Sequence, residues 1–173
     1  MGESGADALD GVGGADASPD SPSPGSSIAV LDIPETHELR GSLVATPDDG
    51  ALVVGSSYSL TDPSTDNDLL VVKLDPSGTP VWTTTLAYSS HGPRRDQAVA
   101  VVALSDGGAL VTGSSEEATG LHAVDIPLVR LDAQGNPVFS RMLGGGQFFE
   151  DYAWALVPGP GGDVYLAGDS GSF

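Results

Sequence analysis

A loop that reads TDPSTDNDLL gathers oxygen-bearing side chains that could bind a metal ion. It holds Asp62, Asp66, Asn67 and Asp68, and several oxygen ligands close together are what Ca²⁺ requires. The loop lacks the ligand spacing and the terminal bidentate Glu of an EF-hand. Asp68 also has a counterpart, Asp125, in a repeated block, which favours a structural role such as capping a turn. We assign no metal ligands, and calcium binding by this loop stays an open alternative.

A segment near the last residues could supply a serine nucleophile. The residues 168–172 read GDSGS and resemble the nucleophile segment of chymotrypsin-like proteases, whose serine needs a His base oriented by a carboxylate. The same positions earlier in the chain read GSS at 55–57 and at 113–115, so a repeat accounts for the segment without catalysis. That family's base motif is absent around the three histidines, His37, His91 and His122. We assign no catalytic residues.

Two further clusters could contact an anion. The Gly144-Gly145-Gly146 run opens no helix, so its amides are not arranged as a phosphate cradle, and a turn is the ordinary interpretation. Arg94 and Arg95, beside His91 in SSHGPRRD, could grip a carboxylate. In so acidic a chain we expect these arginines to pair with neighbouring Asp or Glu instead. Neither cluster implies a cofactor, and we assign no cofactor-binding residues.

Four aromatic side chains occupy apolar runs in the repeated part of the chain. Trp82 and Phe139 share one repeat position, while Trp154 and Tyr165 stand where other copies are aliphatic. Aromatic residues that stack on sugars usually project from loops, whereas these lie in predicted strands. We therefore expect them to pack between repeat units, and no residue is assigned to a carbohydrate site.

The charge balance excludes several classes of partner. Asp and Glu number 24 against 6 Lys and Arg, which gives a net charge of −18 over 173 residues. Such a field repels phosphate backbones and anionic lipid, so we expect no nucleic-acid partner. No stretch approaches the roughly 18 apolar residues of a membrane helix, and the segment MGESGADALD lacks the regions of a signal peptide. We expect no membrane insertion by this chain. The absence of cysteine excludes disulfides and thiolate chemistry.

The elements that position these residues belong to a repeat. The segments DDGALVVGSS, DGGALVTGSS and GGDVYLAGDS align so that Gly55, Gly113 and Gly168 coincide. A second block, DLLVVKLDPSGTPVW, matches DIPLVRLDAQGNPVF further along the chain. A third block begins at Asp96 and again at Asp151, with a weaker copy at Glu38. Three blocks that recur in one order establish the repeat.

Each repeat unit predicts short strands and no helix. Apolar runs separated by Gly, Pro, Asp and Ser are typical of strands bounded by turns, and no window has helical periodicity. DGG at 106–108 and QGN at 134–136 predict tight hairpin turns, because their residues tolerate positive φ. We expect the aligned glycines to end inner strands where the chain turns under close packing. In the second unit the strands are expected at 97–103, 109–114, 126–131 and 137–142.

Four antiparallel strands in a unit of this length are the sequence form of a β-propeller blade. LGGGQFFEDYAWALVPGPGGDVYLAGDSGSF, residues 143–173, resembles the bacterial β-propeller repeat abbreviated SBBP, with its GG turn, acidic residue, Ala-rich strand and V-Y-V-x-G strand. The resemblance covers residues 38–173. Gly162-Asp163 replaces the usual Gly-Asn, and Ala87–Ser90 replaces the Gly-Gly turn. The resemblance implies an exported, surface or secreted bacterial protein, usually without catalytic activity.

The resulting organisation is all-β, with two complete blades and half of a third. We expect a disordered acidic linker at 1–27, because its Gly, Ala, Ser and Pro residues and five carboxylates offer almost nothing to bury; its composition resembles the tethers of bacterial surface lipoproteins. Residues 28–37 are expected to be a lone strand and connector, and Ile28–Ile33 either latches a final blade or pairs locally. The units are 38–95 for blade 1, 96–150 for blade 2 and 151–173 for a partial blade 3.

The function expected from these features is a non-enzymatic scaffold or binding module, extracellular or in the cell envelope. We expect the chain to be a fragment of a longer protein, because propellers close with about four to eight blades. The chain could also self-associate through its incomplete third blade. The alternative is part of a propeller enzyme, a hydrolase or a quinone-dependent dehydrogenase, with its catalytic residues outside this chain. The ligand or partner is not specified by the residues.

Overall fold

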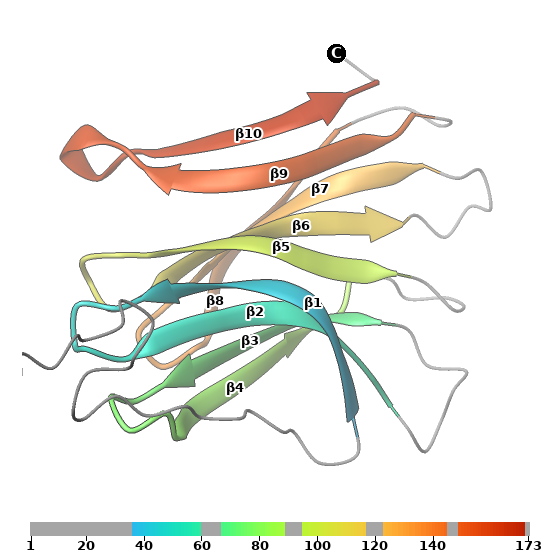
Figure 1. The fold of residues 1–173 in the computed structure, drawn as a ribbon. Coiled ribbons are helices and arrows are strands. Elements are labelled where there is room, and N and C mark those ends of the chain that lie inside the picture. The colour runs from blue at the N-terminus through green and yellow to red at the C-terminus, as the bar shows by residue number, and fades with distance from the viewer. Residues whose placement is uncertain (1–35, 60–66, 89–94, 117–122, 145–148, 172–173) are drawn as a thin grey trace, which may run out of the picture. The chain divides into compact units, whose positions relative to one another are not determined.

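The structure, a computed structural model, describes residues 36–59, 67–88, 95–116, 123–144 and 149–171 (Figure 1). The described residues form an all-β fold, as predicted, with one 3₁₀ turn, Pro160–Gly162. In these ranges no helix has the length and apolarity needed to cross a membrane. The predicted linker at 1–27 and the predicted strand Ile28–Ile33 lie outside the described residues.

The strands form three antiparallel sheets, and within each sheet their order follows the sequence (Figure 1). The first sheet contains β1 (Thr36–Ala45), β2 (Ala51–Ser59), β3 (Asp68–Leu74) and β4 (Pro80–Leu86). The second sheet contains β5 (Asp96–Ala103), β6 (Ala109–Glu116), β7 (Val124–Leu131) and β8 (Pro137–Leu143). The third sheet contains β9 (Asp151–Pro158) and β10 (Val164–Ser170).

The predicted strands of the second unit are confirmed, and each observed strand extends its predicted range by one or two residues. In the first sheet β1 begins at Thr36, two residues before the expected start of that unit at Glu38. Burial differs between inner and outer strands. β3 reads DLLVVKL and its five central residues are buried, whereas β8 is exposed along most of its length.

The repeated glycines lie within strands, not at strand ends, which corrects the sequence-based expectation. In the second sheet Ala98 pairs with Gly113 but Ala100 pairs with Thr112, so Val99 is an extra residue and forms a β-bulge. A Cβ atom on Gly113 would lie 1.8 Å from the carbonyl oxygen of Gln97. The bulged strand therefore approaches so closely that only glycine fits opposite it. The third sheet repeats this register shift opposite Gly168.

The predicted hairpin turns of the second sheet are confirmed. Gly107 and Gly135 both have φ of 83°, the left-handed region that glycine adopts without strain. In the turn between β7 and β8, the Asp132 carboxylate accepts hydrogen bonds from the backbone N–H groups of Gln134 and Asn136, at 2.9 Å and 2.8 Å. These Asx-type bonds fix the turn before the outer strand begins.

Apolar side chains form two clusters, and each cluster joins two sheets. The first contains residues of the first and second sheets: Leu52, Val54, Leu69, Val71, Leu86, Ala98, Val101, Ala109, Val111, Val129 and Leu131. The second joins the second and third sheets: Ala100, Val102 and Leu156, with Leu104, Leu110, Leu128, Val164 and Leu166 packed against them. Strands β5, β6 and β7 contribute to both clusters, so these three strands of the second sheet are covered on both faces, and this burial is the main stabilising contribution.

Candidate functional site

Ser170, the candidate nucleophile, makes a hydrogen bond within the third sheet. Its hydroxyl donates a hydrogen bond to the carboxylate of Asp151, the first residue of β9. Ser170 and Asp151 are also opposite each other in the strand register. The same register recurs in the other sheets, where Glu38 lies opposite Ser57 and Asp96 lies opposite Ser115. The serine therefore follows the repeat, as the sequence predicted. The side chains of the three histidines lie outside the described residues, so none can be placed beside it.

Two buried acids, at the first positions of β5 and β9, stabilise the fold. The sequence marked them as the start of a repeated block but gave them no role. Asp96 and Asp151 are 0% and 1% exposed. Asp96 accepts a hydrogen bond from the backbone N–H of Tyr88, at 2.9 Å, and Tyr88 follows the last strand of the first sheet. The carboxylate thus links one sheet to the next. The signal that could have found this role was the acid at the first position of the third repeated block.

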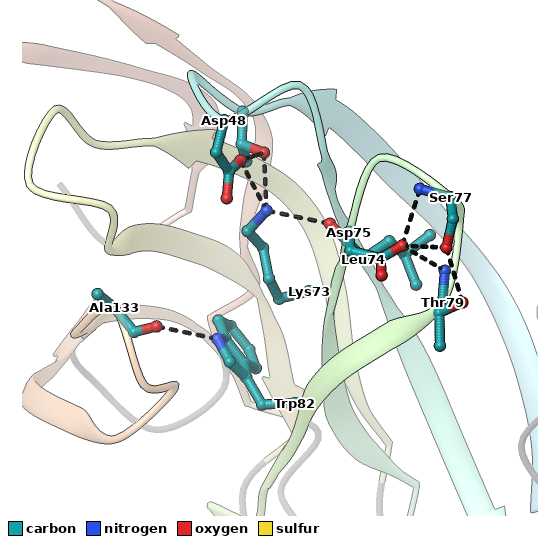
Figure 2. A network of polar contacts seen from close by, with 9 residues as sticks. Asp48, Lys73, Leu74, Asp75, Ser77, Thr79, Trp82 and Ala133 are labelled. Carbon is teal, nitrogen blue, oxygen red and sulfur yellow. Dashed lines mark hydrogen bonds and ion pairs between the residues drawn. The ribbon is translucent and has the colours of Figure 1, made fainter.

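In each of the two four-stranded sheets, a basic residue on the third strand forms an ion pair with an aspartate in the turn between the first two strands. In the first sheet Lys73 lies 2.9 Å from Asp48, and Figure 2 shows its ammonium group directed at this carboxylate. In the second sheet Arg130 pairs with Asp106. The two pairs occupy equivalent repeat positions, so this ion pair is a feature of the repeat. The sequence-based expectations did not include it, although opposite charges recur at these aligned positions.

Lys73 is nearly buried, and its three N–H groups are all used. It donates to Asp48 at 2.9 Å, to the Thr46 hydroxyl at 2.9 Å and to the Leu74 carbonyl at 3.0 Å (Figure 2). Hydrogen bonds from Thr46 and then from Lys73 lower the pKa of the Asp48 carboxyl from 3.8 to about 2. Since an ammonium group has three donors, Lys73 has none left for a ligand.

A cleft lies beside each ion pair, between hairpin turns of neighbouring sheets. The cleft beside Lys73 has a volume of about 130 Å³ and is lined by Thr46, Asp48, Leu104 and Gly108, among others. The cleft beside Arg130 is larger, about 380 Å³, and is lined by residues that include Ser105, Asp106, Gly159 and Asp163. Among its described lining residues the guanidinium is already paired with Asp106 and no imidazole stands next to Ser105. This arrangement can hold water or a small polar molecule but supplies no activated nucleophile.

The outer strand of the first sheet, β4, packs against the β7–β8 turn of the second sheet and donates hydrogen bonds to it. The Trp82 indole N–H donates to the Ala133 carbonyl at 3.1 Å, and the Thr84 hydroxyl donates to the Gly135 carbonyl at 2.7 Å (Figure 2 shows the first bond). A Cβ on Gly135 would lie 2.7 Å from two indole carbons, so the ring lies directly against the glycine. The expectation that Trp82 packs between repeat units is confirmed.

The same expectation is wrong for the other three aromatic residues. Phe139, Trp154 and Tyr165 are 41%, 62% and 57% exposed. The reason is that Phe139 and Tyr165 occupy strand faces against which no described sheet packs, while Trp154 is the extra residue of the bulge in β9. Trp154 contacts the ring of Tyr152, with 6.2 Å between centroids.

The remaining candidate ligands stay unassembled in the described residues. Six of the candidate residues lie outside the described residues: Asp62, Asp66, His91, Arg94, Gly145 and Gly146. The calcium alternative depends on two of them, Asp62 and Asp66. Asn67 and Arg95 form an isolated backbone bridge, and the exposed Arg95 side chain makes no ion pair with the part of the chain that the structure describes, although we expected one.

Metal ligands and known relatives give no further assignment. Within the described ranges no three His, Cys, Asp or Glu side chains gather closely enough to hold a metal ion. No protein-family model matches the chain, and no curated protein matches it. The site that the described residues build best is therefore the repeated contact between neighbouring sheets.

Proposed function

We propose that the chain is an array of β-propeller blades that acts as a non-enzymatic scaffold or binding module. The observation that carries the proposal is a difference between equivalent positions. Val102 in the second sheet is 4% exposed because the third sheet covers it, whereas Val157, its counterpart in the third sheet, is 50% exposed. Tyr165 likewise stands at the position of Leu110, which packs against the third sheet.

The exposed side chains Trp154, Val157 and Tyr165 form what we call the outer face of the third sheet. Exposed apolar groups of this size favour a protein partner. In the described residues, neighbouring sheets of the repeat pack face to face at two places, between the first and second sheets and between the second and third. The surface that best fits the outer face of the third sheet is therefore the face of another such sheet. Binding would bury side chains that now contact water.

The polar groups of the sheet contacts support a binding role over a catalytic one. All three N–H groups of the Lys73 ammonium donate hydrogen bonds within the fold, and the Ser170 hydroxyl donates a hydrogen bond to Asp151. Groups held in this way stabilise a scaffold and leave no acid and base poised for proton transfer. The extracellular or envelope location in this proposal rests on the resemblance to SBBP repeats and on the tether-like composition of the linker.

Sedimentation velocity over a hundredfold range of concentration tests the proposal. The unmodified chain should associate as concentration rises, and Val157→Asp should keep it monomeric, because a buried carboxylate without a partner opposes the contact. Val81→Asp is the matched control, since Val81 is 60% exposed on the first sheet and away from the proposed face. A chain that stays monomeric at every concentration, or an equal loss of association in both variants, would contradict the proposal.

A further inference from the structure

The last strands of the two complete sheets have equivalent faces, but only one of these faces is covered. On β4 the face consists of Trp82, Thr84 and Leu86, and the turn Asp132–Asn136 of the second sheet lies on it. The equivalent residues on β8 are Phe139, Arg141 and Leu143. Phe139 is 41% exposed and Arg141 is exposed, so no described turn covers this face.

Among the described strands, the third sheet has an edge without a second neighbour in the same region of the repeat. In the second sheet β6 has two hydrogen-bonded neighbours, β5 and β7, and β7 in turn pairs with β8. In the third sheet β10, the equivalent of β6, has β9 as its one neighbour among the described residues. The unpaired backbone groups along such an edge can hydrogen bond to an added strand.

We propose that the β10 edge and the Phe139–Arg141–Leu143 face together form a docking site for a β-hairpin with the chemistry of β7–β8. Its first strand pairs with β10, and its turn lies on Phe139 as the Asp132–Asn136 turn lies on Trp82. This inference deepens the proposed function and rests on it, because it assumes that the repeat contact continues past the second sheet.

The turn of the docking hairpin needs a defined chemistry. In the described contact an aspartate holds the turn, glycine at φ of 83° presents its backbone to the aromatic ring, and two carbonyl groups accept hydrogen bonds from the outer strand. The Phe139 side chain, unlike the Trp82 indole, has no N–H to donate. Arg141 stands where Thr84 donates to the Gly135 carbonyl, and its guanidinium can donate to the same kind of carbonyl group. The site therefore selects an Asp-x-x-Gly turn.

Titration of the full chain with a synthetic peptide of the sequence 124–143 tests this inference by calorimetry. The peptide contains β7, its turn and β8. We expect saturable binding and slower amide hydrogen exchange along β10. Phe139→Ser in the chain should weaken binding at least tenfold, and Phe139→Trp should preserve or tighten it, because the indole N–H can donate as Trp82 does. A peptide with Gly135→Val should bind at least tenfold more weakly.

Val138→Ser in the chain is the matched control. Val138 is 53% exposed and adjacent to Phe139, and alternation along a strand places it on the opposite face. Its affinity for the peptide should equal that of the unmodified chain. Absence of saturable binding, equal affinities for Phe139→Ser and Val138→Ser, or protection that spares β10 would overturn the inference. If the chain still associates through Val157 while the peptide does not bind, only this inference fails and the proposed function stands.

Discussion

At some positions a close backbone contact allows only glycine, and Gly113 is the clearest example. The carbonyl oxygen of Gln97 lies 1.8 Å from the position that a Cβ would take, so any side chain must displace the bulged strand. We expect Gly113→Val to lower the free energy of unfolding by about 1–3 kcal/mol through overpacking. Chemical denaturation followed by circular dichroism measures this change.

Gly171→Val is the control for Gly113→Val. A Cβ at Gly171 would meet its nearest atom at 3.4 Å, which is an ordinary contact, and the residue is exposed. Its midpoint should stay close to that of the unmodified chain. If Gly113→Val also leaves the midpoint unchanged, the bulge does not require glycine.

The ion pair of Lys73 and Asp48 predicts a dependence of stability on pH. Hydrogen bonds from Thr46 and Lys73 hold the pKa of Asp48 in the fold at about 2, below its ordinary 3.8. Between these values the unfolded chain binds the proton more readily than the fold does, so stability rises with pH there. The stabilisation by Asp48 is present above 3.8 and is lost as the pH falls through about 2.

Asp48→Asn should therefore lower the thermal midpoint at pH 7, and the difference from the unmodified chain should shrink as the pH approaches 2. Melts at several pH values by circular dichroism provide the measurement. Asp49→Asn, in the same turn but outside the ion pair, is the control. A difference between Asp48→Asn and the unmodified chain that is the same at pH 7 and pH 2 would exclude this titration as the cause.

Between elements, the clasp of β4 on the β7–β8 turn predicts coupling between Trp82 and Gly135. Gly135→Ala should strain a backbone at φ of 83° and also push the new Cβ into the indole. Trp82→Ala removes the second effect, so Gly135→Ala should cost less in that background. The coupling free energy from a double-mutant cycle should be on the order of 1 kcal/mol.

Gly161→Ala is the matched control for this cycle. Gly161 also has a positive φ, 70°, but no heavy atom lies within 4 Å of a Cβ built there. Its cost should be the same with and without Trp82. Additive effects of Trp82→Ala and Gly135→Ala would show that the ring and the turn do not act together.

Strands and turns could be predicted because local signals specify them. Alternating or continuous apolar runs ended by DGG or QGN place the strands of the second sheet to within two residues. The contacts between sheets could not be predicted in the same way. Phe139 and Trp82 share a repeat position, but their burial depends on whether a neighbouring turn covers the strand, and this is a property of the neighbour. The ion pair of Lys73 with Asp48 likewise joins residues from separate hairpins.

For the whole molecule, we expect the acidic segment at 1–27 to contribute much of the charge but almost none of the stability of the fold. It holds five carboxylates and a single Leu, so it has too little apolar surface to stabilise the sheets. Deleting residues 1–27 should leave the thermal midpoint and the circular dichroism per remaining residue nearly unchanged. A clearly lowered midpoint would show that this segment packs on the sheets.

The central claim is that the outer face of the third sheet is an uncovered copy of the contact that joins the other sheets. Amide hydrogen exchange of the chain, measured by mass spectrometry at low and at high concentration, tests this claim directly. The account predicts that exchange slows at high concentration in peptides from β9 and β10, while peptides from β3 and β7 exchange alike at both concentrations. Unchanged exchange in β9 and β10, with slowing confined to the first sheet, would contradict it.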